Sequence, residues 1–142
     1  DSGEGAFRAG GRGNPVGVRA VYCSVDPAAA ILEVAVHKGF RTLDVVPHVL
    51  TSIMIGDASA IHIVRPDDVP NPNWLRPGVP SAGQQAFGAA LLARHPFVAI
   101  PSAVSAHSWN IVFDRRAAAG ACALGGQERL ALDTRLHRPA PA

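Results

Sequence analysis

Hydrophobic positions along the chain change their spacing repeatedly, and these changes predict short strands and helices in irregular order. Apolar residues alternate with polar ones, or form short runs bounded by Gly, Pro or Asp, in several segments typical of β-strands. The predicted strands are 18–24, two strands within 48–65 that separate near Gly56 and Asp57, 97–100, about 110–113 and 129–133. Because strands and helices do not alternate regularly, the pattern favours an α+β sheet fold over a doubly wound one.

Two segments are predicted to form helices. The first begins at Pro27, with Asp26 as its N-cap, and runs to about Lys38, where a glycine follows. Apolar residues occupy all sides of this helix apart from Glu33, so we expect it to be enclosed in the core. The second helix covers residues 81–94.

The remaining segments are rich in glycine or proline and predict loops. Residues 1–17 show no period, and we interpret them as a mobile loop over a site, with an earlier strand missing from the sequence. Residues 66–80 predict a proline-rich surface loop that carries Trp74. We expect one domain over residues 1–142, with a frayed tail from 134 to 142.

Composition limits the classes of protein to which the chain can belong. Its 142 residues are 48% hydrophobic and 17% charged, which is typical of a globular domain. The sequence contains neither an apolar run of about 20 residues nor a signal peptide, so we expect a cytoplasmic protein that does not act at a membrane. The arginines are scattered and the net charge is +2, which does not favour nucleic-acid binding. Neither the cysteines nor the six histidines have metal-site spacing, so we expect no metal.

Glu33 is the single charged residue between Pro27 and Val36. A carboxylate buried there would be costly unless it were paired or used in chemistry. The spacing fits a second interpretation equally well, because Asp26, Ala30, Glu33 and His37 could form one solvated stripe on the helix. The pattern alone leaves both interpretations open.

Arg12 lies in a turn that contains Gly10, Gly11 and Gly13. Glycines allow the backbone to approach a phosphate closely, and a guanidinium can bind two phosphate oxygens at once. An ordinary turn with a solvated arginine is the more common outcome for such a pattern. The segment is neither a Walker loop nor a dinucleotide fingerprint.

Two further polar residues lie at predicted strand ends. Tyr22 can stack on a flat ring, although a lone tyrosine there is more often a core residue with its hydroxyl at the surface. Ser102 follows the buried strand 97–100, but serine after proline is common in loops. No G-x-S-x-G motif surrounds Ser102, so we reject a hydrolase nucleophile elbow.

The order of short motifs is more specific than any one of them. The chain contains, in this order, the motifs SGEGA, GGRxNPxG, VYCS, AxxxLEVxVH, VxIPSAV, WNxxFD and LALDTRL. In this order and spacing the motifs resemble the RES-domain family, which is named for its arginine, glutamate and serine and comprises toxins of bacterial toxin-antitoxin pairs. The resemblance extends from Ser2 to about Leu136.

This resemblance implies a fold similar to mono-ADP-ribosyltransferases, with a split β-sheet core, surrounding helices and an NAD cleft. It implies catalytic functions for Glu33, Arg12 and Ser102. The implied NAD-binding residues are Arg12, Asn14, Tyr22, Ser24 and Ser102. In two respects the chain departs from the family pattern: Gly13 stands where the family usually has tryptophan, and the arginine of an earlier strand is absent.

The implied reaction is cleavage of the bond between nicotinamide and ribose, with NAD consumed as a substrate. The ADP-ribose acceptor is a protein, for which phosphoribosyl pyrophosphate synthetase is one candidate, or else water or phosphate in an NAD glycohydrolase or phosphorylase. An antitoxin of the Xre type that covers the NAD cleft is the implied partner, and a homodimer stays open. The alternative of another class is a catalytically dead antitoxin-binding module, which Gly13 and the missing amino-terminal strand support.

Overall fold

The protein has an α+β fold, as predicted. Its structure, a computed structural model, describes residues 2–70, 73–76, 78–105, 107–131 and 133. Within them the order of elements is α1 (Glu4–Ala9), β1 (Val21–Ser24), α2 (Pro27–Lys38), α3 (Phe40–Val45), β2 (His48–Ile55), β3 (Ile61–Ile63), α4 (Ala82–Leu92), β4 (Phe97–Pro101), β5 (Trp109–Phe113) and β6 (Cys122–Leu130). Short 3-10 helices cover Ala58–Ala60 and Pro66–Asp68. None of the helices in these ranges has the length and apolar character that crossing a bilayer requires.

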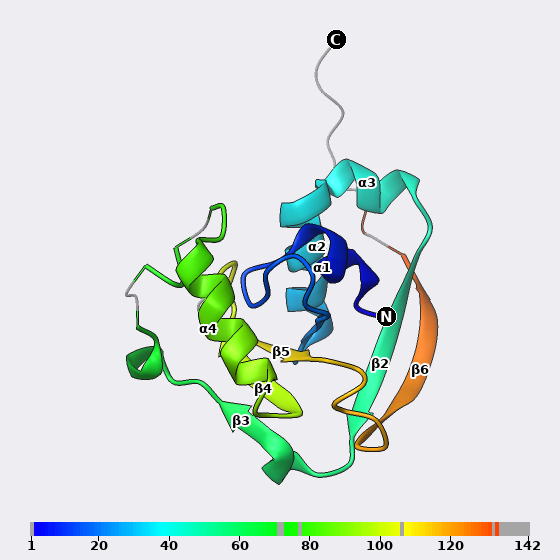
Figure 1. The fold of residues 1–142 in the computed structure, drawn as a ribbon. Helices are drawn as coiled ribbons and strands as arrows, with labels where there is room; N and C mark the ends of the chain where they lie inside the picture. Colours follow the sequence, from blue (N-terminus) through cyan, green and yellow to red (C-terminus); the bar gives the residue numbers. More distant parts are fainter. Residues whose placement is uncertain (1, 71–72, 77, 106, 132, 134–142) are drawn as a thin grey trace.

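The strands form two separate sheets. One has four strands in the order β1-β5-β4-β3, and the other is the antiparallel pair β2-β6 (Figure 1). The β3-β4 pair is parallel, whereas β5 is antiparallel to both of its neighbours. The two strands predicted within 48–65 therefore exist and divide where expected, but they belong to different sheets.

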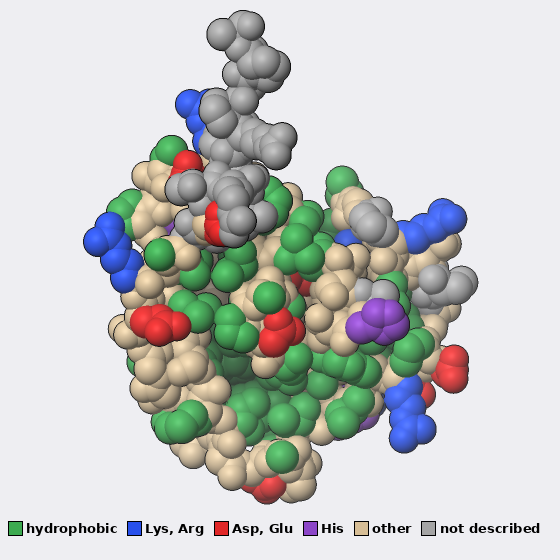
Figure 2. Space-filling model, turned by 180° about the vertical axis from the view of Figure 1, so that it is seen from behind, with side chains coloured by type: hydrophobic (Ala, Val, Ile, Leu, Met, Phe, Trp, Pro, Cys, Tyr) green, Lys and Arg blue, Asp and Glu red, His purple; other side chains and the backbone are tan. Residues whose placement is uncertain are grey.

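Each face of the four-stranded sheet covers a hydrophobic cluster. On one face α4 packs Leu91 and Leu92 against Val98, Ile100 and Val112 of the central strands. On the other face the second cluster joins the four-stranded sheet to the β2-β6 pair, and its members are Val21, Phe97, Phe113 and Ala118, with Ile53, Ile55, Cys23 and Cys122 among the partly buried residues around them. Seen from behind, hydrophobic side chains gather over the lower middle of the molecule and Lys and Arg lie apart from one another at the rim (Figure 2).

Helix α2 begins and ends where the sequence predicts, but it is not enclosed in the core. The Asp26 side chain accepts a hydrogen bond from the Ala29 amide, and Gly39 follows the last turn with a φ of 80°. Ala29 and Ala35 are the buried residues of the helix, whereas the Val36 side chain is 60% exposed. The helix therefore packs a face of small residues against the protein and leaves other apolar residues exposed to solvent. Because apolar residues occupy nearly all sides of the helix, the sequence pattern could not show which face is buried.

The prediction that residues 1–17 form a loop throughout is wrong, because Glu4–Ala9 is the helix α1. Contacts from later in the chain stabilise this short helix. Its Glu4 carboxylate pairs with Arg8 in the next turn and with Arg19. The Phe7 carbonyl accepts a hydrogen bond from the Gly17 amide. A helix of six residues is marginal alone, so these contacts decide the structure.

The predicted last strand is displaced, because β6 covers Cys122–Leu130 and not 129–133. Gly125 and Gly126 lie inside it, and glycine weakens the strand pattern in the sequence. Pairing with β2 determines the strand, from Ile55 opposite Cys122 to His48 opposite Leu130. Helix α3 was likewise not predicted, and the predicted tail 134–142 lies outside the described residues.

Trp74 is buried, although the loop that carries it was predicted to lie at the surface. Its side chain is 2% exposed, and its ring meets that of Phe87 edge-on, with centroids 5.3 Å apart. The loop therefore directs its largest side chain inward against α4, where burial of a large aromatic ring is favourable.

Gly88 allows α4 to contact the glycine-rich turn directly. A Cβ atom at Gly88 would lie 2.3 Å from the Gly13 carbonyl oxygen and 2.4 Å from the Gly13 Cα. We expect Gly88→Ala to lower the free energy of unfolding by about 1–3 kcal/mol, because two backbone segments must separate. Denaturant unfolding measures this change.

Gly5→Ala is the matched control, since Gly5 also lies in a helix and a Cβ there would meet nothing within 4 Å. We expect it to be neutral or to stabilise the protein by up to about 1 kcal/mol. Equal stabilities of the two variants would show that α4 does not contact the turn as closely as described.

Candidate functional site

The carboxylate of Glu33 is held by two donors, one from the turn after β4 and one from β5. Its Oε1 accepts a hydrogen bond from Ser102 Oγ at 2.9 Å and one from Asn110 Nδ2 at 2.6 Å. Among the described residues no donor binds Oε2. Glu33 is half-buried and its carboxylate points to the sheet. It is therefore not part of a solvated stripe on the helix. Its carboxylate keeps one oxygen for a ligand.

Ser102 fixes this arrangement from the end of β4. All of Phe97–Pro101 is buried, and the chain turns directly after it. The Ser102 hydroxyl is 1% exposed, donates to Glu33, and accepts hydrogen bonds from the amides of Val104 and Ser105. Because these bonds occupy the hydroxyl, Ser102 holds Glu33 in place and its side chain has no donor or acceptor left for a ligand.

Asn110 is a site residue that the sequence interpretation missed. It lies opposite Ser24 in the β1-β5 register, and Ser24 Oγ donates to Asn110 Oδ1 at 2.7 Å. Its amide group therefore links Ser24 to Glu33, with the oxygen accepting and the nitrogen donating. Asn110 is the asparagine of the WNxxFD motif, but the sequence interpretation gave no residue of that motif a function in the site.

Tyr22 lies two residues before Ser24, so both side chains emerge on the same face of β1, about 7 Å apart. Its hydroxyl donates to Asn14 Oδ1 at 2.7 Å and accepts from the Gly13 amide at 3.0 Å. The residue is still 40% exposed, which leaves part of the ring available for stacking. Burial of the hydroxyl disfavours phenolate and raises the pKa of Tyr22 to about 12.

Asn14 has a structural function at the base of the turn. It is fully buried, and its Nδ2 donates to the carbonyl oxygens of Ala6, Pro15 and Val18. With Oδ1 occupied by Tyr22, all of its polar atoms are used within the chain. Any contribution of Asn14 to ligand binding therefore passes through Tyr22 and the turn.

Arg12 extends from this turn to the proline-rich loop. Its Nη1 donates to the Trp74 carbonyl oxygen at 3.0 Å, and its Nη2 donates to the Gly78 carbonyl oxygen at 3.2 Å. No carboxylate within the described ranges pairs with Arg12, so its guanidinium is oriented by neutral acceptors and keeps its charge. This is neither a freely solvated arginine nor one neutralised by an ion pair.

Contacts link these residues in one row: Gly13, next to Arg12, donates to Tyr22, which shares a face of β1 with Ser24, and Ser24 is joined through Asn110 to Glu33. A cation and a tyrosine ring lie at one end, and at the other lies a carboxylate whose Oε2 has no donor among the described residues. The members of the row, from the turn to the helix, are Arg12, Tyr22, Ser24, Asn110 and Glu33. Such an arrangement suits a ligand that is anionic at one end and develops positive charge at the other.

The RES-domain model matches residues 1–133. The chain belongs to the RES-domain family. Its fold is similar to that of a chain in the crystal structure of the M. tuberculosis MbcT-MbcA toxin-antitoxin complex, with a TM-score of 0.64 and 22% sequence identity over 91% of this chain and 76% of that one. Among curated proteins, none matches the sequence.

The RES-domain member described here contains one tyrosine, so its phenol can be titrated without overlap. We expect the ultraviolet absorbance of tyrosinate to appear with a midpoint near pH 12 in the folded protein, compared with about 10 for an unperturbed phenol. Because the folded state raises this pKa, the associated stability is complete below pH 10 and is lost as the pH rises toward 12.

Tyr22→Phe is the control for this titration, since it removes the signal and the pH dependence that Tyr22 contributes. A midpoint near 10 in the folded wild-type protein would contradict the burial of the Tyr22 hydroxyl.

Proposed function

We propose that this protein is the toxin of a toxin-antitoxin pair and that it consumes NAD by cleaving the bond between nicotinamide and ribose. The observation that carries the proposal is the Glu33 carboxylate, which two donors hold by one oxygen while the other has no donor within the described residues. Membership in the RES-domain family and the likeness in fold to a toxin-antitoxin complex chain support the same conclusion.

Glu33 is the catalytic residue of this proposal. The nicotinamide-ribose bond breaks with its electron pair leaving on nicotinamide, and positive charge develops on the ribose as in glycoside cleavage. The free Oε2 of Glu33 stabilises that charge and accepts a hydrogen bond from a ribose hydroxyl. One positioned group of this kind typically contributes about 3–4 kcal/mol to lowering the barrier.

Arg12 and Tyr22 bind the substrate in the proposed complex. Arg12 carries a full positive charge beside two neutral acceptors, and phosphate oxygens make stronger hydrogen bonds to guanidinium than carbonyls do. It therefore binds the pyrophosphate, while the exposed part of the Tyr22 ring stacks on a flat group. Ser102 and Asn110 are positioning residues that aim the carboxylate.

The ADP-ribose goes to a protein side chain in our leading proposal, with phosphoribosyl pyrophosphate synthetase as one candidate target. The attacking group forms a bond to the ribose carbon as the bond to nicotinamide breaks, and its proton passes to Glu33 Oε2. The second candidate is a glycohydrolase or phosphorylase, because the free carboxylate oxygen can also take the proton of an attacking water. In either case a cognate antitoxin that covers the NAD-binding face keeps the enzyme inactive in its own cell.

We expect Glu33→Gln to lower kcat by about 100- to 1,000-fold, because glutamine retains an acceptor for Ser102 and Asn110 but not the charge. Purified protein is incubated with NAD labelled in the adenosine part and a cell extract, and released nicotinamide and labelled protein are both measured. Glu128→Gln on the exposed side of β6 is the matched control and should leave both unchanged.

The same assay separates the candidates. A labelled protein band supports transfer, whereas nicotinamide release without a band supports glycohydrolase or phosphorylase activity. If the wild-type protein releases no nicotinamide, the chain is an antitoxin-binding module without turnover and the proposal fails.

Asn110→Ala tests the positioning of Glu33. We expect kcat to fall by about 10- to 100-fold with little change in KM, because the carboxylate loses a donor but the binding groups remain. The exposed Gln127→Ala on β6 serves as the control. An unchanged kcat for Asn110→Ala would show that Ser102 alone orients Glu33.

A further inference from the structure

The orientation of Arg12 depends on a residue 62 positions away in the sequence. The Trp74 carbonyl oxygen accepts a hydrogen bond from Arg12 Nη1 at 3.0 Å. The same oxygen accepts a second bond, at 2.9 Å, from Gln84 Nε2. With two donors, both lone pairs of this carbonyl oxygen are in use. The position of the carbonyl, and so of the loop that carries it, determines the orientation of the guanidinium.

Gln84 secures this carbonyl to α4. It is buried, and its side-chain oxygen accepts from the Ser81 amide while the Ser81 hydroxyl accepts from the Gln84 amide. This capping box makes Gln84 part of the helix start and not a mobile side chain. The loop carbonyl that holds Arg12 is therefore attached to a helix packed on the sheet.

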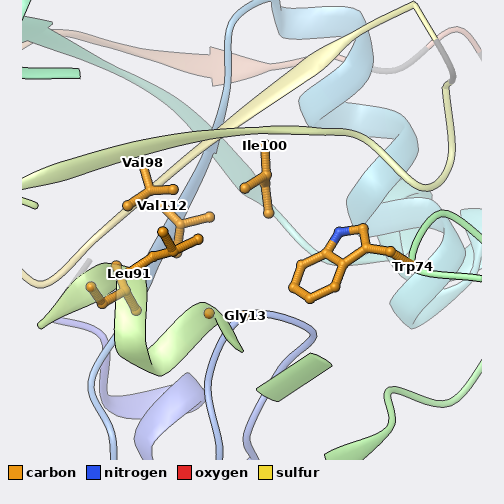
Figure 3. Close-up of a pocket in the computed structure, with 8 residues that line it drawn as sticks. Gly13, Trp74, Leu91, Val98, Ile100 and Val112 are labelled. Carbon is orange, nitrogen blue, oxygen red and sulfur yellow. The ribbon is translucent and has the colours of Figure 1, made fainter. Parts of the chain in front are cut away.

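The indole of Trp74 secures the loop from the other side. Its ring is buried and meets Phe87 edge-on. Together with Leu91, Val98 and Ile100 it lines a cavity of about 10 Å³, whose wall also includes Gly13, the neighbour of Arg12 (Figure 3). The ring thus occupies the space between the glycine-rich turn and the sheet.

The indole nitrogen makes no hydrogen bond within the described part of the chain. A buried donor without an acceptor is unfavourable, so polar contacts of the side chain do not explain its place in the structure. The contribution of the Trp74 side chain therefore comes from the packing of its ring, which positions the main-chain carbonyl of the same residue. A phenylalanine ring should therefore retain most of its function.

We propose that Trp74 is a positioning residue for Arg12: its buried ring fixes the carbonyl that orients the guanidinium toward an anionic ligand. Because Trp74 and Gly78 offer neutral acceptors, they orient Arg12 without cancelling its charge. The part that concerns NAD rests on the proposed function, with the pyrophosphate as the anion. Trp74 itself does not contact the ligand.

Trp74→Ala should raise KM for NAD about tenfold and leave kcat within about twofold, because binding is lost equally in the ground and transition states. Trp74→Phe should stay within about threefold of the wild-type KM. Leu43→Ala, which truncates a buried side chain of α3, is the control for general destabilisation and should not change KM. A wild-type KM in Trp74→Ala would overturn the proposal.

Nuclear magnetic resonance of arginine labelled with ¹⁵N gives a readout that does not depend on NAD. The Nη signals of Arg12, assigned by their loss in Arg12→Lys, should be resolved in the wild type because two hydrogen bonds hinder rotation of the guanidinium. They should merge in Trp74→Ala. Hindered rotation that persists in Trp74→Ala would contradict the proposal even if the protein did not turn over NAD.

If Trp74→Ala does not fold, Phe87→Leu replaces it, since it removes the ring contact without altering any hydrogen bond of Arg12. Faster guanidinium rotation in Phe87→Leu supports the proposal, and unchanged rotation overturns it. Absence of nicotinamide release by the wild type, with the expected rotation data, would refute the proposed function and leave the relation between Trp74 and Arg12 intact.

Discussion

A half-buried carboxylate requires hydrogen-bond donors, and the donors to Glu33 come from separate parts of this fold. The donors come from the turn after β4 and from β5, while the carboxylate comes from α2. Three elements far apart in the sequence must therefore meet at one oxygen. The antiparallel β4-β5 register brings Ser102 and Asn110 to the same end of the sheet. The Ser102 hydroxyl is saturated there, and both donors bind the same carboxylate oxygen, so Oε2 is the carboxylate atom left to meet a ligand.

The other end of the row is built on a different principle. Asn14 organises the glycine-rich turn through the Tyr22 hydroxyl and three carbonyl oxygens, and this bonding is internal to the chain. Arg12 leaves that turn and is oriented by carbonyls of the proline-rich loop. The carboxylate is thus held by side chains and the cation by backbone. A single strand, β1, spans the two ends, so the spacing between them is fixed by strand geometry.

The sequence predicts well the elements that depend on neighbouring residues, and poorly those that depend on residues far along the chain. The start of α2 depends on Asp26 and its neighbours, and the strand β4 on one continuous apolar run, so both were predicted closely. Helix α1 and strand β6 depend on partners more than ten residues away, and their local patterns are weak. Asn110 illustrates the same limit at the site, because its chemistry arises from the β1-β5 register and from α2, neither of which the residue's own neighbours reveal.

We propose that Glu33 Oε2 and the Arg12 guanidinium bind opposite ends of one NAD molecule. A crystal structure of the protein with an NAD analogue that resists cleavage tests this binding mode. We expect the ribose hydroxyl within hydrogen-bond distance of Glu33 Oε2 and the pyrophosphate on Arg12, with Ser102 and Asn110 still bound to Oε1. An analogue bound elsewhere, or one whose ribose does not approach Glu33, would rule this binding mode out.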